Sequence, residues 1–161
     1  MDMTTAPYIA VFLLFVALYV LAEARRDYNK IQAGKEIDHL ERWVVRAGVV
    51  TLVAAVFVLP MRWKALLLLP IGAFGFSAAF RWCLNRMRGK HWAYIAPWSS
   101  LYDRFFFGLS NWDWAWPWSW LEYKYHEGSV GHVDFIHRAG RRAYLTEITI
   151  VVLAIAAILL T

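Results

Sequence analysis

Four long runs of apolar residues constrain the fold of this chain more than any other feature. They occupy residues 8–22, 49–59, 65–80 and 148–160. With its flanks, each run gives about 17 to 19 residues of helix, or ~25–29 Å, which is close to the ~30 Å hydrocarbon core of a bilayer. A chain of 161 residues has too little polar sequence to cover four such helices in water. We therefore predict an all-α integral membrane protein, a single polytopic domain over residues 1–161 with spans at about 7–23, 43–59, 63–82 and 144–161.

The distribution of basic residues predicts how these spans are oriented. Residues 1–24 contain no Lys or Arg, whereas five of the 17 lie between Arg25 and Arg42 and nine between Arg81 and Arg142. Short connections rich in Lys and Arg stay on the cytoplasmic side of a membrane. The first and third connections are thus predicted inside and both termini outside, with the bacterial inner membrane as the expected location.

The third connection contains a strip of tryptophans at alternate positions, Trp112, Trp114, Trp116, Trp118 and Trp120. In an extended backbone this spacing places all five rings on one side, and Pro117 opposes a continuous helix. Indole rings suit the boundary between acyl chains and headgroups, while a ligand platform usually has rings that converge with polar partners. We predict an aromatic-rich, interfacial, cytoplasmic segment over about residues 90–125, with a ligand platform as the alternative.

Basic residues at the ends of the third connection predict contact with lipid headgroups. Arg81, Arg86, Arg88 and Lys90 follow the third apolar run, and Arg141 and Arg142 precede the fourth. Each such charge near an anionic membrane surface contributes ~1 kcal/mol to binding. Because no basic domain free of the bilayer is visible, the net charge of +5 indicates a bilayer containing anionic lipid as the partner, and not nucleic acid.

Three ionisable residues lie at the predicted cytoplasmic edge of the spans: Glu23, Arg46 and Glu147. Ionisable groups at membrane depth are costly and usually paired. We expect an intramembrane ion pair of Arg46 with either Glu147 or Glu23, which would fix how the helices pack. A proton or ion pathway would need more such groups, deeper in the bilayer.

Two acid-and-histidine pairs offer an enzymatic alternative. Glu36 and His39 form one pair at i, i+3, and Asp134 and His137 form the other. Residues three apart share a helix face, and these ligand types occur in metal sites of carboxylate-bridged helical bundles. Chance placement also produces such pairs. Such a site needs two further carboxylates, for which Glu23 and Glu147 are candidates that lie deeper in the predicted spans.

The sequence contains no catalytic motif, and it does not identify a cofactor, which stays unknown. The hypothesis we favour is a small non-enzymatic membrane protein, an accessory or structural subunit that packs against lipid and other membrane protein subunits or self-associates. One alternative is a membrane-bound metalloenzyme that uses the two pairs above. Another is a pore-forming or lysis-type membrane protein.

Overall fold

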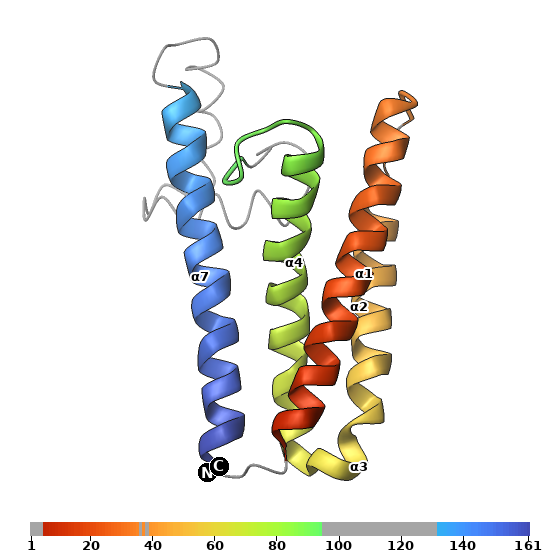
Figure 1. The fold of residues 1–161 in the computed structure, drawn as a ribbon, viewed down its shortest axis with the longest axis vertical. Coiled ribbons are helices and arrows are strands. Elements are labelled where there is room, and N and C mark those ends of the chain that lie inside the picture. The colour runs from red at the N-terminus through yellow and green to blue at the C-terminus, as the bar shows by residue number, and fades with distance from the viewer. Residues whose placement is uncertain (1–4, 36, 38, 95–131) are drawn as a thin grey trace.

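The computed structural model describes residues 5–35, 37, 39–94 and 132–161, and this part of the chain is helical with no strand. Four long helices within it run alongside one another (Figure 1). They are α1 (Ala6–Gln32), α2 (His39–Val56), α4 (Leu68–Met87) and α7 (His132–Leu160). Two short elements, α3 (Val58–Met61) and the 3-10 helix η1 (Arg62–Leu67), connect α2 to α4. The predicted all-α fold is confirmed for these residues.

Three segments of the described chain are long and apolar enough to cross a membrane: Ala6–Gln32, Val58–Met87 and Gly140–Leu160. The apolar part of α2, Val44–Val56, is shorter. A fourth span therefore stays a prediction. Two helices also extend beyond the predicted spans, since α1 continues to Gln32 and α7 begins at His132.

The third predicted span lies within the segment Val58–Met87, but its first residues are not regular α-helix. Residues Arg62–Leu67 form the 3-10 helix η1, and regular α-helix begins only at Leu68. Pro70 accounts for this, because it has no N–H to donate to the carbonyl of Leu66 and its ring crowds that carbonyl. The chain reverses direction just before, at Arg62, whose φ of 53° lies in a region that residues other than glycine rarely adopt.

Helix α4 lies in the middle of the assembly, between α7 on one side and α1 and α2 on the other (Figure 1). Fully buried side chains from three elements meet around it: Phe12, Leu68, Ile71 and Ile158. Helix α2 approaches α4 closely at Gly72, where an added Cβ would clash with Cγ1 of Val50. The core is therefore built around α4.

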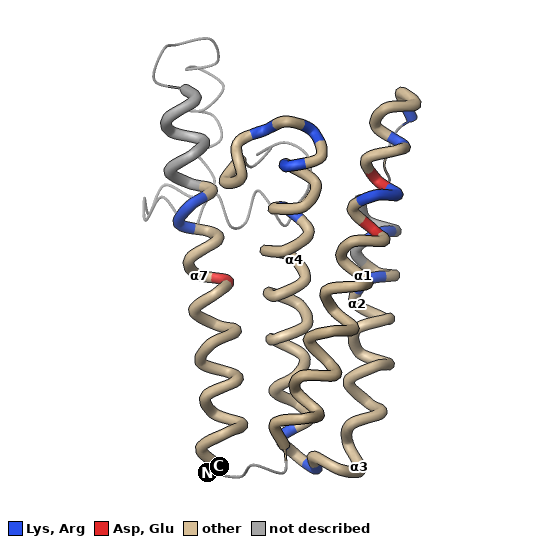
Figure 2. Tube along the Cα trace, viewed as in Figure 1, with Lys and Arg blue, Asp and Glu red and all other residues tan. Residues whose placement is uncertain are grey.

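The charged residues gather at one end of the helices (Figure 2). At this charged end α1 and α4 finish, and α2 and α7 begin. Arg62 and Lys64 lie at the opposite end, in the connection between α2 and α4. Between the two ends the helices are almost entirely apolar.

Candidate functional site

Two groups of ionisable side chains join helices near the charged end. The first, which we call the α1–α2 cluster, consists of Glu23, Asp27, Arg42 and Arg46. Its acids are four residues apart on α1 and its arginines four apart on α2, so each pair shares a helix face. Arg46 Nε donates to Glu23 Oε2 at 3.1 Å, and Arg46 Nη2 donates to Asp27 Oδ2 at 2.6 Å. One guanidinium thus binds both carboxylates.

The α1–α2 cluster is largely withdrawn from solvent. Glu23, Asp27 and Arg42 are all buried, and Nη1 of Arg42 lies 3.9 Å from Oε2 of Glu23. The guanidinium of Arg46 also lies over two rings of α4, 4.2 Å from the centroid of Phe80 and 5.5 Å from that of Phe76. Such cation–π contacts add about 0.5–2 kcal/mol. Arg46 therefore connects α1, α2 and α4.

Two polar atoms of this cluster have no hydrogen-bond partner among the described residues: Oδ1 of Asp27 and Nη1 of Arg42. A buried polar atom without a partner costs about 1–3 kcal/mol. Their charges are balanced by neighbouring groups, since Asp27 binds Arg46 and Arg42 lies near Glu23. Among the described residues, the cluster therefore contains one buried acceptor and one buried donor without a hydrogen-bond partner.

The second group, the α4–α7 cluster, consists of Ser77, Arg81 and Glu147. Arg81 donates to both carboxylate oxygens of Glu147, from Nη1 at 3.1 Å and from Nη2 at 3.0 Å. The hydroxyl of Ser77 donates to Oε1 of Glu147 at 2.9 Å. Glu147 is 0% exposed, so its charge depends on these contacts.

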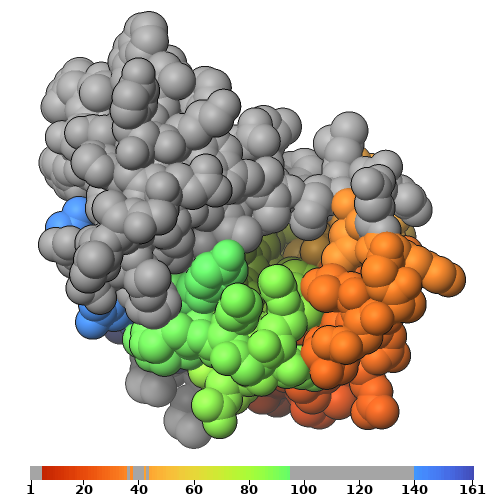
Figure 3. Space-filling view, turned by 90° about the horizontal axis from the view of Figure 1, so that it is seen from above, coloured from red at the N-terminus to blue at the C-terminus, as the bar shows by residue number. Residues whose placement is uncertain are grey.

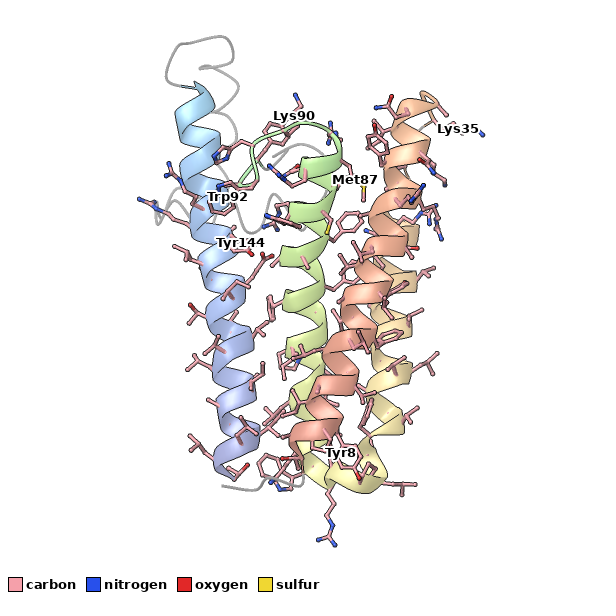
Figure 4. All side chains as sticks on the ribbon, in the orientation of Figure 1. Tyr8, Lys35, Met87, Lys90, Trp92 and Tyr144 are labelled. Carbon is pink, nitrogen blue, oxygen red and sulfur yellow. The ribbon has the colours of Figure 1, made fainter. Side chains whose placement is uncertain are left out.

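A short loop after α4 covers the same end of the assembly. Nδ2 of Asn85 donates to the carbonyl oxygens of Trp92 and Tyr94, at 3.1 and 2.7 Å. These bonds fold the chain back, and the Trp92 ring meets the Tyr144 ring of α7 edge-on, with centroids 5.4 Å apart (Figure 4). The loop thus provides a second contact between α4 and α7 beside the ionic one.

The structure brings together some of the residues that the sequence predicts to act as a site. Arg46 binds Glu23, one of the two partners considered for it. The other, Glu147, binds Arg81, for which the sequence predicts a headgroup contact; in the structure Arg81 instead pairs with this carboxylate. Arg81 faces α7 because it lies one turn after Ser77 on the face of α4 that contacts α7.

The other predicted interface residues lie at the charged end. Arg86, Lys90, Arg141 and Arg142 are exposed there, and Arg88 is half-buried. The tryptophan strip Trp112, Trp114, Trp116, Trp118 and Trp120 lies outside the described residues. So does nearly all of the predicted interfacial segment over about 90–125.

The proposed metal ligands Glu36, His39, Asp134 and His137 lie outside the part of the chain whose side chains the structure describes. Within that part, no three His, Cys, Asp or Glu residues are close enough together to hold a metal ion. The metal site therefore stays a prediction.

Sequence reasoning missed four members of the two clusters: Asp27, Arg42, Ser77 and Arg81 as the partner of Glu147. A signal existed for the first two, since Asp27 follows Glu23 by one helical turn and Arg42 precedes Arg46 by one turn. Both groups connect helices through charges that are already paired, an arrangement suited to holding helices together.

The chain matches no known family model, no curated protein and no solved structure.

Proposed function

We propose that this chain is a small integral membrane protein that crosses the bilayer four times and works without catalysis, as an accessory or structural subunit. Three apolar segments long enough to span support the membrane location. In this proposal α2 is the fourth span, because its 18 residues reach ~27 Å at 1.5 Å per residue. Arg46 of α2 enters the membrane edge bound to two carboxylates of α1, and Arg42 lies near one of them, which lowers the cost of placing these charges there.

In the proposed topology the charged end faces the cytoplasm of a bacterial cell, and both termini lie outside the inner membrane. The gathering of Lys and Arg at that end supports this orientation. It places the tryptophan strip in the cytoplasmic headgroup layer, beside anionic lipid.

The observation that carries the subunit role is the one-sided packing of α7. This helix packs mainly on α4, and its other faces expose large apolar side chains, including Leu145, Val152 and Leu153. In a membrane, such a surface is open to acyl chains and to helices of other proteins. The ionisable groups of the two clusters bind one another across helices, which is a structural role.

Cysteine labelling in intact cells tests the topology. The natural Cys83 is buried and is replaced by Ala to provide the background. We expect Trp63→Cys, at an exposed position of η1, to react with a membrane-impermeant maleimide from outside. Lys35→Cys, after α1, should react only once the cells are lysed. Labelling of Lys35→Cys in intact cells would contradict the proposed orientation.

Crosslinking from α7 tests the subunit role. A photo-reactive amino acid at Leu153, which is exposed, should give a protein adduct in native membranes, whereas the same group at the buried Ile158 should not. Purification in mild detergents should recover the same adduct partner. A chain that runs as a lone monomer in every gentle detergent, and that gives no adduct from Leu153, is not a subunit of a larger assembly.

A further inference from the structure

The charged end of α1 carries an open pocket of about 490 Å³ that neither cluster includes. We refer to it as the basic pocket. Its polar lining residues are Arg25, Arg26, Asn29, Lys30 and Lys35. None is acidic, and two alanines, Ala22 and Ala33, complete the wall. Four cations around one opening, without a carboxylate in the lining, indicate a site for an anion.

The local backbone explains why Lys35 joins residues of the preceding helix. Helix α1 ends at Gln32, and Gly34 has a φ of 65°, the left-handed conformation that glycine adopts without strain. The N–H of Lys35 then donates to the carbonyl of Lys30 at 3.0 Å. This turn returns Lys35 to the end of the helix (Figure 4).

Charge pairing elsewhere on α1 leaves the basic pocket strongly positive. The acids of α1, Glu23 and Asp27, are bound by Arg46 of α2, and Glu23 also accepts a contact from Arg26 at 3.0 Å. Within the described residues no carboxylate pairs with Arg25, Lys30 or Lys35. Among the described residues, the positive charges of these three side chains are therefore not neutralised by a carboxylate.

An apolar stripe runs directly from the basic pocket towards the other end of α1. Val11, Leu14 and Leu18 are all exposed, and they lie on the same helix face as Ala22 and Arg25, at spacings of three and four residues. Seen from above, the end of α1 lies at the edge of the molecule (Figure 3). One exposed surface thus presents cations at the membrane edge and aliphatic side chains below them.

We propose that the basic pocket binds the phosphate of an anionic phospholipid, whose acyl chains lie along the stripe of Val11, Leu14 and Leu18. A lipid fits this surface better than a soluble anion does, because a soluble anion would use the cations alone. An anionic headgroup is favoured over a zwitterionic one, since a choline or ethanolamine cation would be repelled by Arg25, Lys30 and Lys35. The inference rests on the membrane location in the proposed function and names a specific lipid-binding position within it.

Native mass spectrometry of the full chain in detergent tests the inference. Phosphatidylglycerol and phosphatidylcholine are titrated against the wild type, against the single variants Arg25→Gln and Lys30→Gln, and against the matched control Arg62→Gln, which is exposed in η1 at the opposite end of the helices. We expect the wild type to prefer phosphatidylglycerol. Each pocket variant should weaken that binding about fivefold, whereas Arg62→Gln, with the same change in net charge, should weaken it much less.

A competition arm distinguishes the lipid from free phosphate. Inorganic phosphate or glycerol phosphate in large molar excess should fail to displace phosphatidylglycerol, because neither contacts the apolar stripe. Displacement by either would overturn the lipid assignment, and equal weakening by the pocket variants and by Arg62→Gln would overturn the site. Circular dichroism checks that all three variants keep the wild-type helix content. Membrane fractionation of the wild type is scored separately, so a chain found in the membrane without a lipid preference contradicts this inference alone.

Discussion

The α1–α2 cluster and the α4–α7 cluster join helices in different ways. The first holds two carboxylates and two guanidiniums between helices that pack against α4 more than against each other. The second holds one carboxylate and one guanidinium between helices that pack closely along their length. Where direct helix packing is sparse, this chain uses several charges; where packing is extensive, a single ionic contact accompanies it.

The two clusters also differ in what happens when one partner is lost. Glu23 lies near three guanidiniums, those of Arg26, Arg42 and Arg46. Glu147 is bound by Arg81 and by the hydroxyl of Ser77. We therefore expect substitutions in the α4–α7 cluster to be the more damaging, and the predictions below are ordered accordingly.

The largest effect is expected for Glu147→Ala. It removes the carboxylate that binds Arg81, whose side chain is only 10% exposed, and breaking a buried pair costs about 3–5 kcal/mol. Denaturation in mixed detergent micelles, followed by circular dichroism, measures the free energy of unfolding. The double variant Arg81→Met/Glu147→Leu removes both charges and should recover most of the loss. A loss below ~1 kcal/mol for the single variant would mean that the pair does not hold α7.

Arg46→Ala is expected to destabilise by about 2–3 kcal/mol, less than Glu147→Ala, because Arg42 and Arg26 remain near Glu23. Arg46→Lys should lie between Arg46→Ala and the wild type, since one ammonium keeps the charge but loses the planar fork that reaches both carboxylates. The same micelle assay applies. If Arg46→Ala proved more damaging than Glu147→Ala, the order of the two clusters would be reversed.

Gly72→Ala tests whether close packing against α4 holds α2 in place, in addition to the ionic contacts of the α1–α2 cluster. The new methyl group would clash with Val50 Cγ1 and lie 3.1 Å from Phe12 Cζ, so we expect a loss of about 1–2 kcal/mol from overpacking. Gly75→Ala is the matched control, because its methyl group would lie 3.7 Å from Val151 Cγ2. Adding Val50→Ala to Gly72→Ala should restore stability. Equal effects of the two glycine substitutions would argue against a close contact at Gly72.

The smallest effect is expected for Arg26→Gln. Its guanidinium lies 3.0 Å from Glu23 but is 49% exposed, and exposed ion pairs contribute at most about 1 kcal/mol. We expect a change below ~0.5 kcal/mol in the micelle assay. A loss as large as that of Arg46→Ala would show that the exposed arginine, and not the buried one, stabilises the α1–α2 cluster.

Much of the helical fold could be predicted from the apolar runs, because run length and composition report directly on helices that avoid water. The ends were less accurate. The polar turns at the end of α1, up to Gln32, and at the start of α7, from His132, lie outside the apolar runs from which the helices were predicted. Near Pro70, the first residues of the third predicted span form the 3-10 helix η1 in place of α-helix.

The candidate site was only partly predictable. Sequence reasoning could identify Arg46 and its two possible carboxylates as groups that need partners. It could not decide whether Glu23 or Glu147 binds Arg46, since the choice of partner depends on which faces of α1, α4 and α7 meet in three dimensions. Glu147 binds Arg81 because α4 lies between α7 and the other helices, a fact that no local pattern contains.

The contact between Arg81 and Glu147 has a consequence for biosynthesis. The two residues are 66 positions apart, so at roughly 5–20 residues per second the ribosome needs about 3 to 13 seconds to add Glu147 after Arg81. During membrane insertion, the Arg81 guanidinium on the nascent α4 would have no carboxylate partner until Glu147 is added, so in that interval it would lie near water or within the insertion machinery. Release of α4 into lipid before α7 emerges would strand a charge among acyl chains, so the two helices are expected to leave the insertion machinery together.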